Sequence, residues 1–320
     1  MNQLKKEIVH FTHTDADALG CALVLDYATP NTKKITYHTN YQNIREKTQE
    51  VLDYIHQYSP SLLVISDISF ASEKHELLLL QEINNKTDTK VILFEHHEYD
   101  EGFFNDITIN YIHDKSKCAT LIMRDYFKVE NKHLNNLCQI INSFDIWQEH
   151  NPLFPVGLGF DNWFWNEHKS KNKSIEQIAH EIAENGYTLP KDFKNYFQEY
   201  TKAFTNKLQN LKDRQLFIDD GFIALVFTDE YFNEALHESF SKNGNKVALI
   251  VNSYGIIRIR FSTVEPLSID TKEKIKIGIL GKLGHGHLNA FSIKIDNSNF
   301  EKIMARVQEL TAIINKHKPQ

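Results

Sequence analysis

SLLVISDISFASEKHELLLLQEINNKTDTKVILFEHH, which spans residues 61–97, holds two continuous apolar runs with a helical segment between them. The runs cover residues 61–68 and 90–94, and the segment 72–84 has the pattern of a helix. Continuous apolar strands joined by a helix are typical of a parallel sheet that is covered on both faces. The stretch therefore predicts an α/β fold.

The flanking sequence extends this pattern in both directions. Before the stretch we expect a short strand, an apolar helix, an edge strand and an amphipathic helix, at residues 6–12, 18–27, 33–39 and 42–58. After it we expect a further strand and two helices, at residues 106–112, 117–128 and 132–144. Strands that alternate with helices indicate a Rossmann-like parallel sheet in the first half of the chain.

The second half has a different organisation. Residues 151–166 are aromatic and carry Pro152, Pro155, Gly157 and Gly159, which predicts a loop. Residues 168–214 are polar with helical periodicity, and strand-like runs begin after them. We expect strands at 222–227, 246–254 and 256–262, and helices at 230–242 and 299–316. The predicted division is a first domain at 1–165, a helical connector at 166–214 and a smaller α/β domain at 215–320.

Composition excludes some classes of protein. Apolar residues make up 41% of the 320 residues, enough for a sizeable core, but no unbroken apolar run is long enough to span a membrane. The start, MNQLKKEIVHFTHTDAD, has no signal-peptide pattern, and three cysteines form no metal-type spacing, so we expect a reduced, cytoplasmic protein. A net charge of −6 argues against stable binding of long duplexes.

Four polar clusters fall where the predicted crevice of the sheet should be. They are His13 to Asp17 after the first strand, Asp67, Glu95-His96-His97, and Asp145 in NSFDIW. In open α/β sheets the ligand crevice lies at the carboxyl ends of the strands. Carboxylates and imidazoles together suit Mn²⁺, Zn²⁺ or Fe²⁺, and so many acids would repel one another without cations. The clusters therefore predict a site for two divalent metal ions.

Each acidic residue taken alone has a simpler interpretation. Asp15 or Asp17 is more often a helix N-cap than a metal ligand, and Asp67 at a strand end is more often a turn residue. The prediction depends on their joint placement after successive strands of one sheet.

The order of these clusters resembles the DHH phosphoesterase family, and HTDADALGC (13–21), ISDIS (65–69) and SFDIW (143–147) resemble the nanoRNase branch most closely. The resemblance implies that one metal is held by His13, Asp15 and Asp67. It implies that the other is held by Asp17, Asp67, His96 and Asp145, with Asp67 shared.

The resemblance also assigns the remaining residues of the third cluster. It implies that His97 contacts the phosphate or orients a neighbour rather than binding metal. It also implies that Glu95, which stands where the family has Asp, supports the histidines from behind. Asp67, Glu95 and His97 are thus the expected catalytic residues. The extra methylene moves the Glu95 carboxylate by ~1.5 Å, so metal preference or rate is expected to differ.

The last third of the chain resembles the DHH-associated substrate-binding domain. Its glycine-rich loop is GKLGHGH, in which Gly284, His285, Gly286 and His287 are expected to contact the substrate. Arg260, in IRIRFS, is expected to bind a terminal phosphate, although an outward-facing strand residue is an equal alternative.

The expected function is hydrolysis of short oligonucleotides to 5′-mononucleotides with two divalent ions, Mn²⁺ foremost. Three alternatives stay open: a phosphatase of 3′-phosphoadenosine 5′-phosphate, a phosphodiesterase of cyclic or linear signalling dinucleotides, and a non-catalytic nucleotide-binding module. Trp147, Phe160, Trp163 and Trp165 could stack a base, although core packing suits most of them better. The expected partner is a short oligonucleotide or nucleotide, with no membrane, and exposed strand edges leave a homodimer open.

Overall fold

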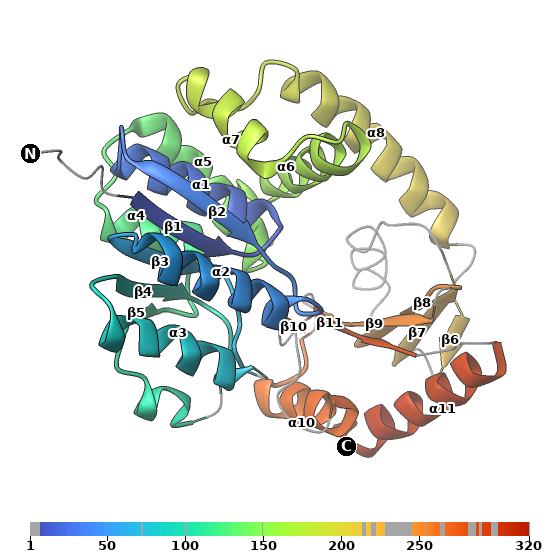
Figure 1. The fold of residues 1–320 in the computed structure, drawn as a ribbon. Helices are drawn as coiled ribbons and strands as arrows, with labels where there is room; N and C mark the ends of the chain where they lie inside the picture. Colours follow the sequence, from blue (N-terminus) through green and yellow to red (C-terminus); the bar gives the residue numbers. More distant parts are fainter. Residues whose placement is uncertain are drawn as a thin grey trace, which may run out of the picture. The chain divides into compact units, whose positions relative to one another are not determined.

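The structure is a computed structural model. It describes residues 7–71, 73–99, 101–148, 150–212, 216–218, 222–227, 245–253, 255–262, 266–280, 286–287, 290–295 and 300–319. The chain divides into two compact units, Met1–Glu199 and Tyr200–Gln320, and Figure 1 shows the elements of each.

The first unit is built on a five-stranded sheet in the order β2-β1-β3-β4-β5, and every neighbouring pair is parallel (Figure 1). Its strands are β1 (Glu7–Thr12), β2 (Lys33–His38), β3 (Leu62–Ser66), β4 (Lys90–Glu95) and β5 (Asn110–His113). The predicted α/β class with a parallel sheet is confirmed. The last strand begins later than expected, because Phe103–Asp106 forms the short 3-10 helix η1.

Helices cover both faces of this sheet, which explains the continuous apolar runs. Val64 of β3 packs in one core with α1 (Ala16–Ala28), α4 (Ala119–Tyr126) and α5 (Lys132–Asp145). Leu63 and Ile65 pack in a second core with α2 (Ile44–Tyr58) and α3 (Lys74–Lys86). Since successive side chains of a strand point to opposite faces, a strand buried on both faces must be apolar throughout.

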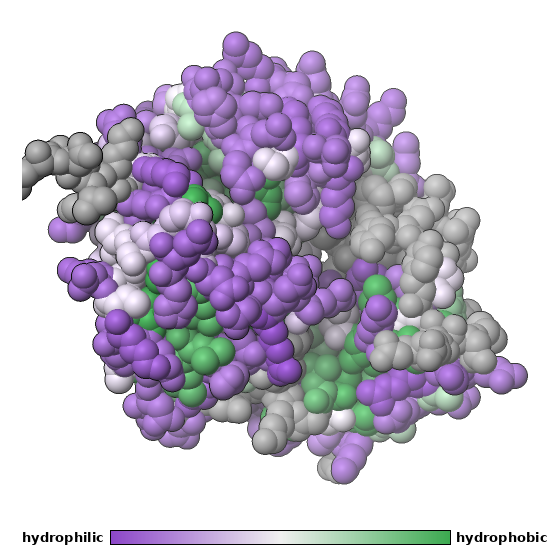
Figure 2. Space-filling model, in the orientation of Figure 1, coloured by the Kyte–Doolittle hydropathy of each residue, from purple (hydrophilic) through white to green (hydrophobic). Residues whose placement is uncertain are grey.

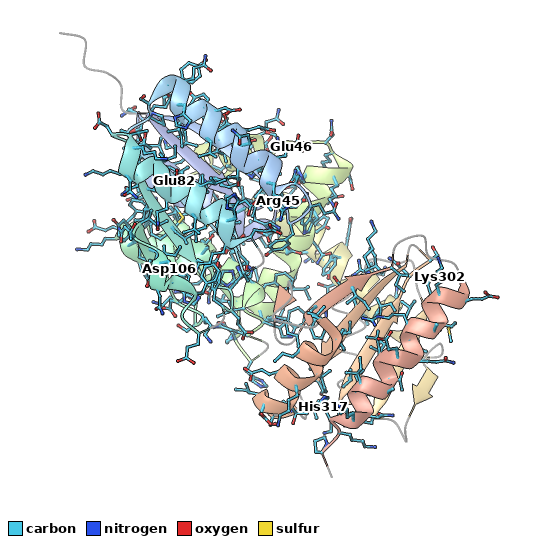
Figure 3. The ribbon with its side chains drawn as sticks, turned by 60° about the horizontal axis from the view of Figure 1, so that its bottom comes forward. Arg45, Glu46, Glu82, Asp106, Lys302 and His317 are labelled. Atoms are coloured by element: carbon cyan, nitrogen blue, oxygen red, sulfur yellow. The ribbon has the colours of Figure 1, made fainter. Side chains whose placement is uncertain are left out.

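The outer surfaces of α2 and α3 are polar and joined by ion pairs. Arg45, labelled in Figure 3, contacts Glu73 at 3.0 Å and Glu76 at 3.2 Å. Hydrophilic residues dominate the face of the first unit that Figure 2 presents. Because the Arg45 side chain is largely exposed, these pairs contribute little to stability, and the helices are held mainly by their apolar faces.

The aromatic segment predicted as a loop is instead helix α6 (Phe154–Trp165), so that prediction is wrong. Pro155 occupies the first turn, where its missing N–H costs nothing. A Cβ at position 157 would lie 2.5 Å from the Ile140 carbonyl oxygen and 2.8 Å from Ser143 Oγ. Gly157 is therefore required because α6 packs unusually close to α5, and not because the chain turns there.

Two more helical elements follow α6 in the first unit. The π-helical turn η2 (Asn166–Ser170) continues from α6, and α7 (Ile175–Glu184) packs against α1. Ser174 and Gln177 form a capping box that starts α7. The long helix α8 (Phe193–Lys212) then passes from the first unit into the second.

The second unit contains a six-stranded mixed sheet in the order β10-β11-β9-β8-β7-β6. Its elements are β6 (Leu216–Ile218), β7 (Ile223–Phe227), β8 (Val247–Val251), β9 (Ile256–Phe261), α10 (Ile269–Leu280), β10 (Gly286–His287), β11 (Ala290–Lys294) and α11 (Phe300–Lys316). Apolar residues of α10 and α11 pack on one face of this sheet. The predicted strands of this half and its final helix are present, whereas β6, β11 and α10 were not predicted. The helix expected at 230–242 lies outside the described residues.

Two further observations concern the chain as a whole. Cys21, Cys118 and Cys138 are buried, and all three thiols are free. Among the residues that the structure describes, no helix is both long and apolar enough to cross a membrane.

Candidate metal centre

Three strands of the first sheet end level with one another and deliver the predicted residues to a common edge. Thr12 of β1 is in register with Ser66 of β3, and Ser66 is in register with Phe94 of β4. The next residues along each strand are His13, Asp67 and Glu95. Parallel strands in this register bring residues far apart in the sequence to one site.

The predicted ligands form three groups whose ligand atoms lie within 4.8 Å of one another. One group is His13, Asp15 and Asp67; another is Asp17, His96 and Asp145; the third is Asp67, His96 and His97. Asp67 belongs to two groups and so does His96, so the groups adjoin. The structure brings all six predicted metal ligands together, with His97 beside them.

Asp15 is both a helix cap and a candidate ligand. Its Oδ1 accepts hydrogen bonds of 3.1 Å from the backbone N–H groups of Asp17 and Ala18, which caps α1. Its Oδ2 accepts a 2.7 Å hydrogen bond from His13 Nδ1. This interaction lowers the pKa of Asp15 against the effect of burial, and it raises the pKa of His13 in the same way.

Asp17 is held by the helix that follows β5. Its two carboxylate oxygens accept hydrogen bonds from Ala119 N at 2.8 Å and Thr120 N at 2.9 Å, at the start of α4. The side chain is buried, with 1% of its surface exposed. Two backbone donors at a helix N-terminus fix the orientation of this carboxylate and stabilise its charge.

Asp67 and His96 lie at the centre of the cluster, with exposed fractions of 2% and 4%. His96 Nε2 is 3.3 Å from Asp67 Oδ1 and 3.5 Å from Asp145 Oδ2. Asp67 has a backbone φ of +56°, a left-handed conformation that Asp adopts more readily than most residues. The chain thus turns sharply at the end of β3 and leaves the carboxylate in the site.

The chemistry of the cluster suits divalent cations. Burial raises the pKa of Asp67 and Asp145 well above the usual range, and the neighbouring carboxylates raise both further. Asp67 Oδ2 and Asp145 Oδ2 are buried and have no hydrogen-bond partner among the described residues. Because buried polar atoms are rarely left unsatisfied, these two oxygens fit the role of metal ligands.

Glu95 contacts the two histidines that follow it in the chain. Its Oε1 accepts hydrogen bonds from His96 N at 2.6 Å, His97 N at 2.7 Å and His97 Nδ1 at 2.5 Å. Burial opposes ionisation, but the contacts with His97 and His96 lower the pKa of Glu95 to about 2. The longer side chain therefore still supports both histidines as a carboxylate.

Tyr41 is a site residue that the sequence analysis missed. Its hydroxyl lies 3.4 Å from His97 Nε2, and its ring centroid is 5.6 Å from that of His13. Burial raises the pKa of Tyr41 well above its usual value, and Asp67 and Glu95 raise it further. The phenol therefore stays protonated and can donate a hydrogen bond. No sequence motif marks this residue, because it lies in the turn after β2.

His38 was also missed, and it connects α7 to the metal centre. Its Nδ1 donates a 2.8 Å hydrogen bond to the backbone carbonyl of His13, and its Nε2 lies 2.7 Å from Glu176 Oε1 at the start of α7. The only feature of the sequence that could have indicated His38 as a site residue is its position at the end of β2. His38 therefore holds the backbone of a candidate ligand in place.

The predicted residues of the second unit are only partly described. Arg260 lies on β9 in register with Ala290, and its Nη1 donates a 3.0 Å hydrogen bond to the Ile259 carbonyl. Gly286 and His287 form β10, and nothing is described of the His287 side chain. Gly284 and His285 lie outside the described residues. Substrate binding by this loop and by Arg260 stays a prediction.

Two solved structures have folds similar to that of this chain. RecJ in complex with Mn²⁺ from Thermus thermophilus matches with a TM-score of 0.53 and 14% identity, over 99% of this chain and 53% of that one. The fold resembles that of RecJ. An uncharacterized protein from Helicobacter pylori G27 matches with a TM-score of 0.50 and 20% identity, over 97% of this chain and 99% of that one.

These similarities concern the fold alone. The chain spans about half the length of the RecJ chain that it matches. No protein-family model matches the sequence, and no curated protein matches it either.

Proposed function

We propose that this protein is a phosphodiesterase that uses two divalent metal ions, Mn²⁺ foremost, to hydrolyse short oligonucleotides to 5′-mononucleotides. The observation that carries the proposal is the pair of ligand groups joined by one buried carboxylate. Asp67 shares one group with His13 and Asp15 and another with His96 and His97. The similarity of the fold to RecJ, whose structure contains Mn²⁺, supports it.

The candidate ligands fall into two adjoining groups, each of which could hold one cation. His13 and Asp15 would hold one ion and Asp17, His96 and Asp145 the other, with Asp67 between them. Two bound divalent ions supply a water of lowered pKa and neutralise charge on a phosphodiester. Nitrogen and oxygen donors in this mixture favour Mn²⁺, Fe²⁺ or Zn²⁺ over Mg²⁺ or Ca²⁺.

The groups beside these ligands would act on the substrate. Glu95 fixes the His97 ring through Nδ1, which leaves Nε2 beside the Tyr41 hydroxyl. Because Nδ1–H donates to Glu95, Nε2 of His97 donates only in the imidazolium form; in that form His97 would contact a phosphoryl oxygen, and the Tyr41 hydroxyl beside it could donate as well. Donors fixed before the substrate arrives stabilise developing negative charge without the cost of reorganisation.

The test is hydrolysis of a labelled dinucleotide by the purified full chain with Mn²⁺. We expect mononucleotide products, and we expect Asp67→Asn to abolish them. Asp53→Asn is the matched control, because Asp53 is an exposed carboxylate on α2, away from the cluster. Unchanged dinucleotide with Mn²⁺, Zn²⁺, Fe²⁺ and Mg²⁺ alike would overturn the proposal.

A substrate panel separates the alternatives that share this metal centre. Longer oligonucleotides, cyclic dinucleotides, 3′-phosphoadenosine 5′-phosphate and pyrophosphate would be offered under the same Mn²⁺ conditions. Fastest turnover of a dinucleotide supports the proposal, whereas fastest turnover of another substrate reassigns the specificity. Tight nucleotide binding without any turnover would identify a binding module instead.

A further inference from the structure

The two outermost strands of the first sheet supply none of the six candidate metal ligands, yet each ends in a histidine. β2 ends at His38 and β5 ends at His113, at opposite edges of the sheet (Figure 1). His38 Nδ1 donates to the backbone carbonyl of His13, as described above, and His113 Nε2 donates to the backbone carbonyl of His97 at 2.7 Å. Because a carbonyl oxygen only accepts hydrogen bonds, the ring nitrogen is the donor in both contacts.

The turn that carries His97 has a second hydrogen bond to the same edge of the sheet. Asp114, the residue after β5, donates its backbone N–H to the Glu95 carbonyl at 3.1 Å. The backbone of residues 95–97 is therefore held at its first and its last residue. Glu95 Oε1 then orients the His97 ring by accepting a 2.5 Å hydrogen bond from Nδ1. The carboxylate sets the direction of the ring, and His113 sets the position of the backbone that carries it.

The His113 ring is itself packed between aromatic side chains. Its centroid lies 5.4 Å from that of Tyr99, in an edge-to-face contact, and 5.3 Å from that of Phe104. Tyr99 is fixed in turn, because its hydroxyl accepts a 3.2 Å hydrogen bond from the backbone N–H of Phe70. A side chain whose rotamer is restricted by packing holds its hydrogen-bond partner in one place.

We propose that His113 is a positioning residue for His97, and that it serves turnover and not metal binding. His38 provides the contrast, because it holds the backbone of His13, a candidate metal ligand, in the same manner. The inference rests on the proposed function, in which His97 contacts the phosphoryl group and His13 binds a cation. The two edge strands thus serve different parts of the site, β2 the metal ions and β5 the substrate phosphate.

The test compares His113→Phe with His113→Gln in the full chain, with Mn²⁺ and a labelled dinucleotide. Phenylalanine keeps a ring between Tyr99 and Phe104 but has no donor, whereas the glutamine amide can donate from near the position of Nε2. We expect His113→Phe to lower kcat by about 10- to 100-fold, because small displacements of a contacting group cost this much, with the Mn²⁺ affinity in calorimetry unchanged. His113→Gln should restore most of the lost activity.

His38→Phe is the matched comparison. Loss of a partner that orients a metal ligand typically weakens metal affinity by about 10- to 100-fold, so this variant should bind Mn²⁺ less tightly by about that factor. Wild-type kcat in His113→Phe, or Mn²⁺ binding that is weakened as much as in His38→Phe, would overturn the inference. A His113→Gln variant that melts at the wild-type temperature and stays as slow as His113→Phe would also overturn it.

Nuclear magnetic resonance of the metal-free protein separates this result from the fate of the proposed function. The His97 Nδ1 proton lies in a short hydrogen bond to a carboxylate and should give a resonance far downfield. This resonance should shift or broaden in His113→Phe and persist in His113→Gln and His38→Phe. An unchanged resonance in His113→Phe would overturn the positioning role even in an active enzyme. A changed resonance in a protein that hydrolyses no dinucleotide would retain that role and refute the enzyme.

Discussion

Replacing Asp67 with Asn should stabilise the metal-free protein while it removes the response to metal. Asp67 is 2% exposed, lies among Asp15, Asp17 and Asp145, and has one oxygen without a hydrogen-bond partner among the described residues. The amide has the same shape, tolerates the left-handed backbone, carries no charge and adds a donor toward the neighbouring acids.

The size of the effect follows from the burial. Relief of an unsatisfied buried group is worth about 1–3 kcal/mol, and in a unit of this size each kcal/mol shifts the melting temperature by about 2–4 °C. The variant should therefore melt roughly 2–12 °C above the wild type in EDTA. At Mn²⁺ concentrations of about 100 times Kd, the wild type should gain about 2.7 kcal/mol for each site, or roughly 5–11 °C, and the variant far less.

Scanning calorimetry of both proteins, in EDTA and in Mn²⁺, measures all four melting temperatures. The order of stability should invert between the two conditions, and the exposed control Asp53→Asn should follow the wild type in both. The reasoning fails if Asp67→Asn melts below the wild type in EDTA, or if it keeps the full Mn²⁺ shift. Either result would mean that Asp67 serves the fold and not the metal.

Three further predictions concern other parts of the first unit. Burial lowers the pKa of His10 from 6.5 to about 3, so unfolding takes up a proton between these pH values. Urea titrations should therefore show that the free energy of unfolding falls by about 1.4 kcal/mol per pH unit as the pH drops below 6.5. His10→Gln should reduce this pH dependence. Tyr41→Phe should lower kcat by about 10²-fold with unchanged Mn²⁺ affinity in calorimetry; an unchanged kcat would remove Tyr41 from the site. Gly157→Ala should cost about 1–3 kcal/mol in thermal melts because its Cβ would meet backbone. Gly278→Ala should cost less, because its Cβ would meet side-chain atoms, with Ile313 Cγ2 nearest at 2.8 Å; equal losses would contradict the packing argument.

Much of the first unit could be predicted because local pattern and tertiary role agree there. Residues 61–97 alternate between apolar strands and an amphipathic helix, and a strand buried on both faces leaves no other interpretation. The residues after each strand were then expected at one edge, and the structure brings His13, Asp67 and His96 together there.

Prediction failed where a residue type has two uses. Pro155, Gly157 and Gly159 resemble loop residues, but in α6 the proline occupies the first turn and Gly157 accommodates a neighbouring helix. Asp15 and Asp17 were weighed as either caps or ligands. In the structure both belong to candidate ligand groups, while Asp15 also caps α1 and Asp17 also accepts hydrogen bonds from the first turn of α4. Sequence alone cannot reveal the neighbour that decides between such uses.

The amino-acid sequence by itself determined the parallel sheet of the first unit and the set of polar residues at its edge, because hydrophobic periodicity and the succession of segments along the chain are local properties. The tertiary structure alone decided the surroundings of that edge. Tyr41, His38 and Glu176 reach it from a turn, an edge strand and a distant helix. Contacts of this kind depend on how helices and strands pack together, and the residue spacing within one segment does not determine that packing.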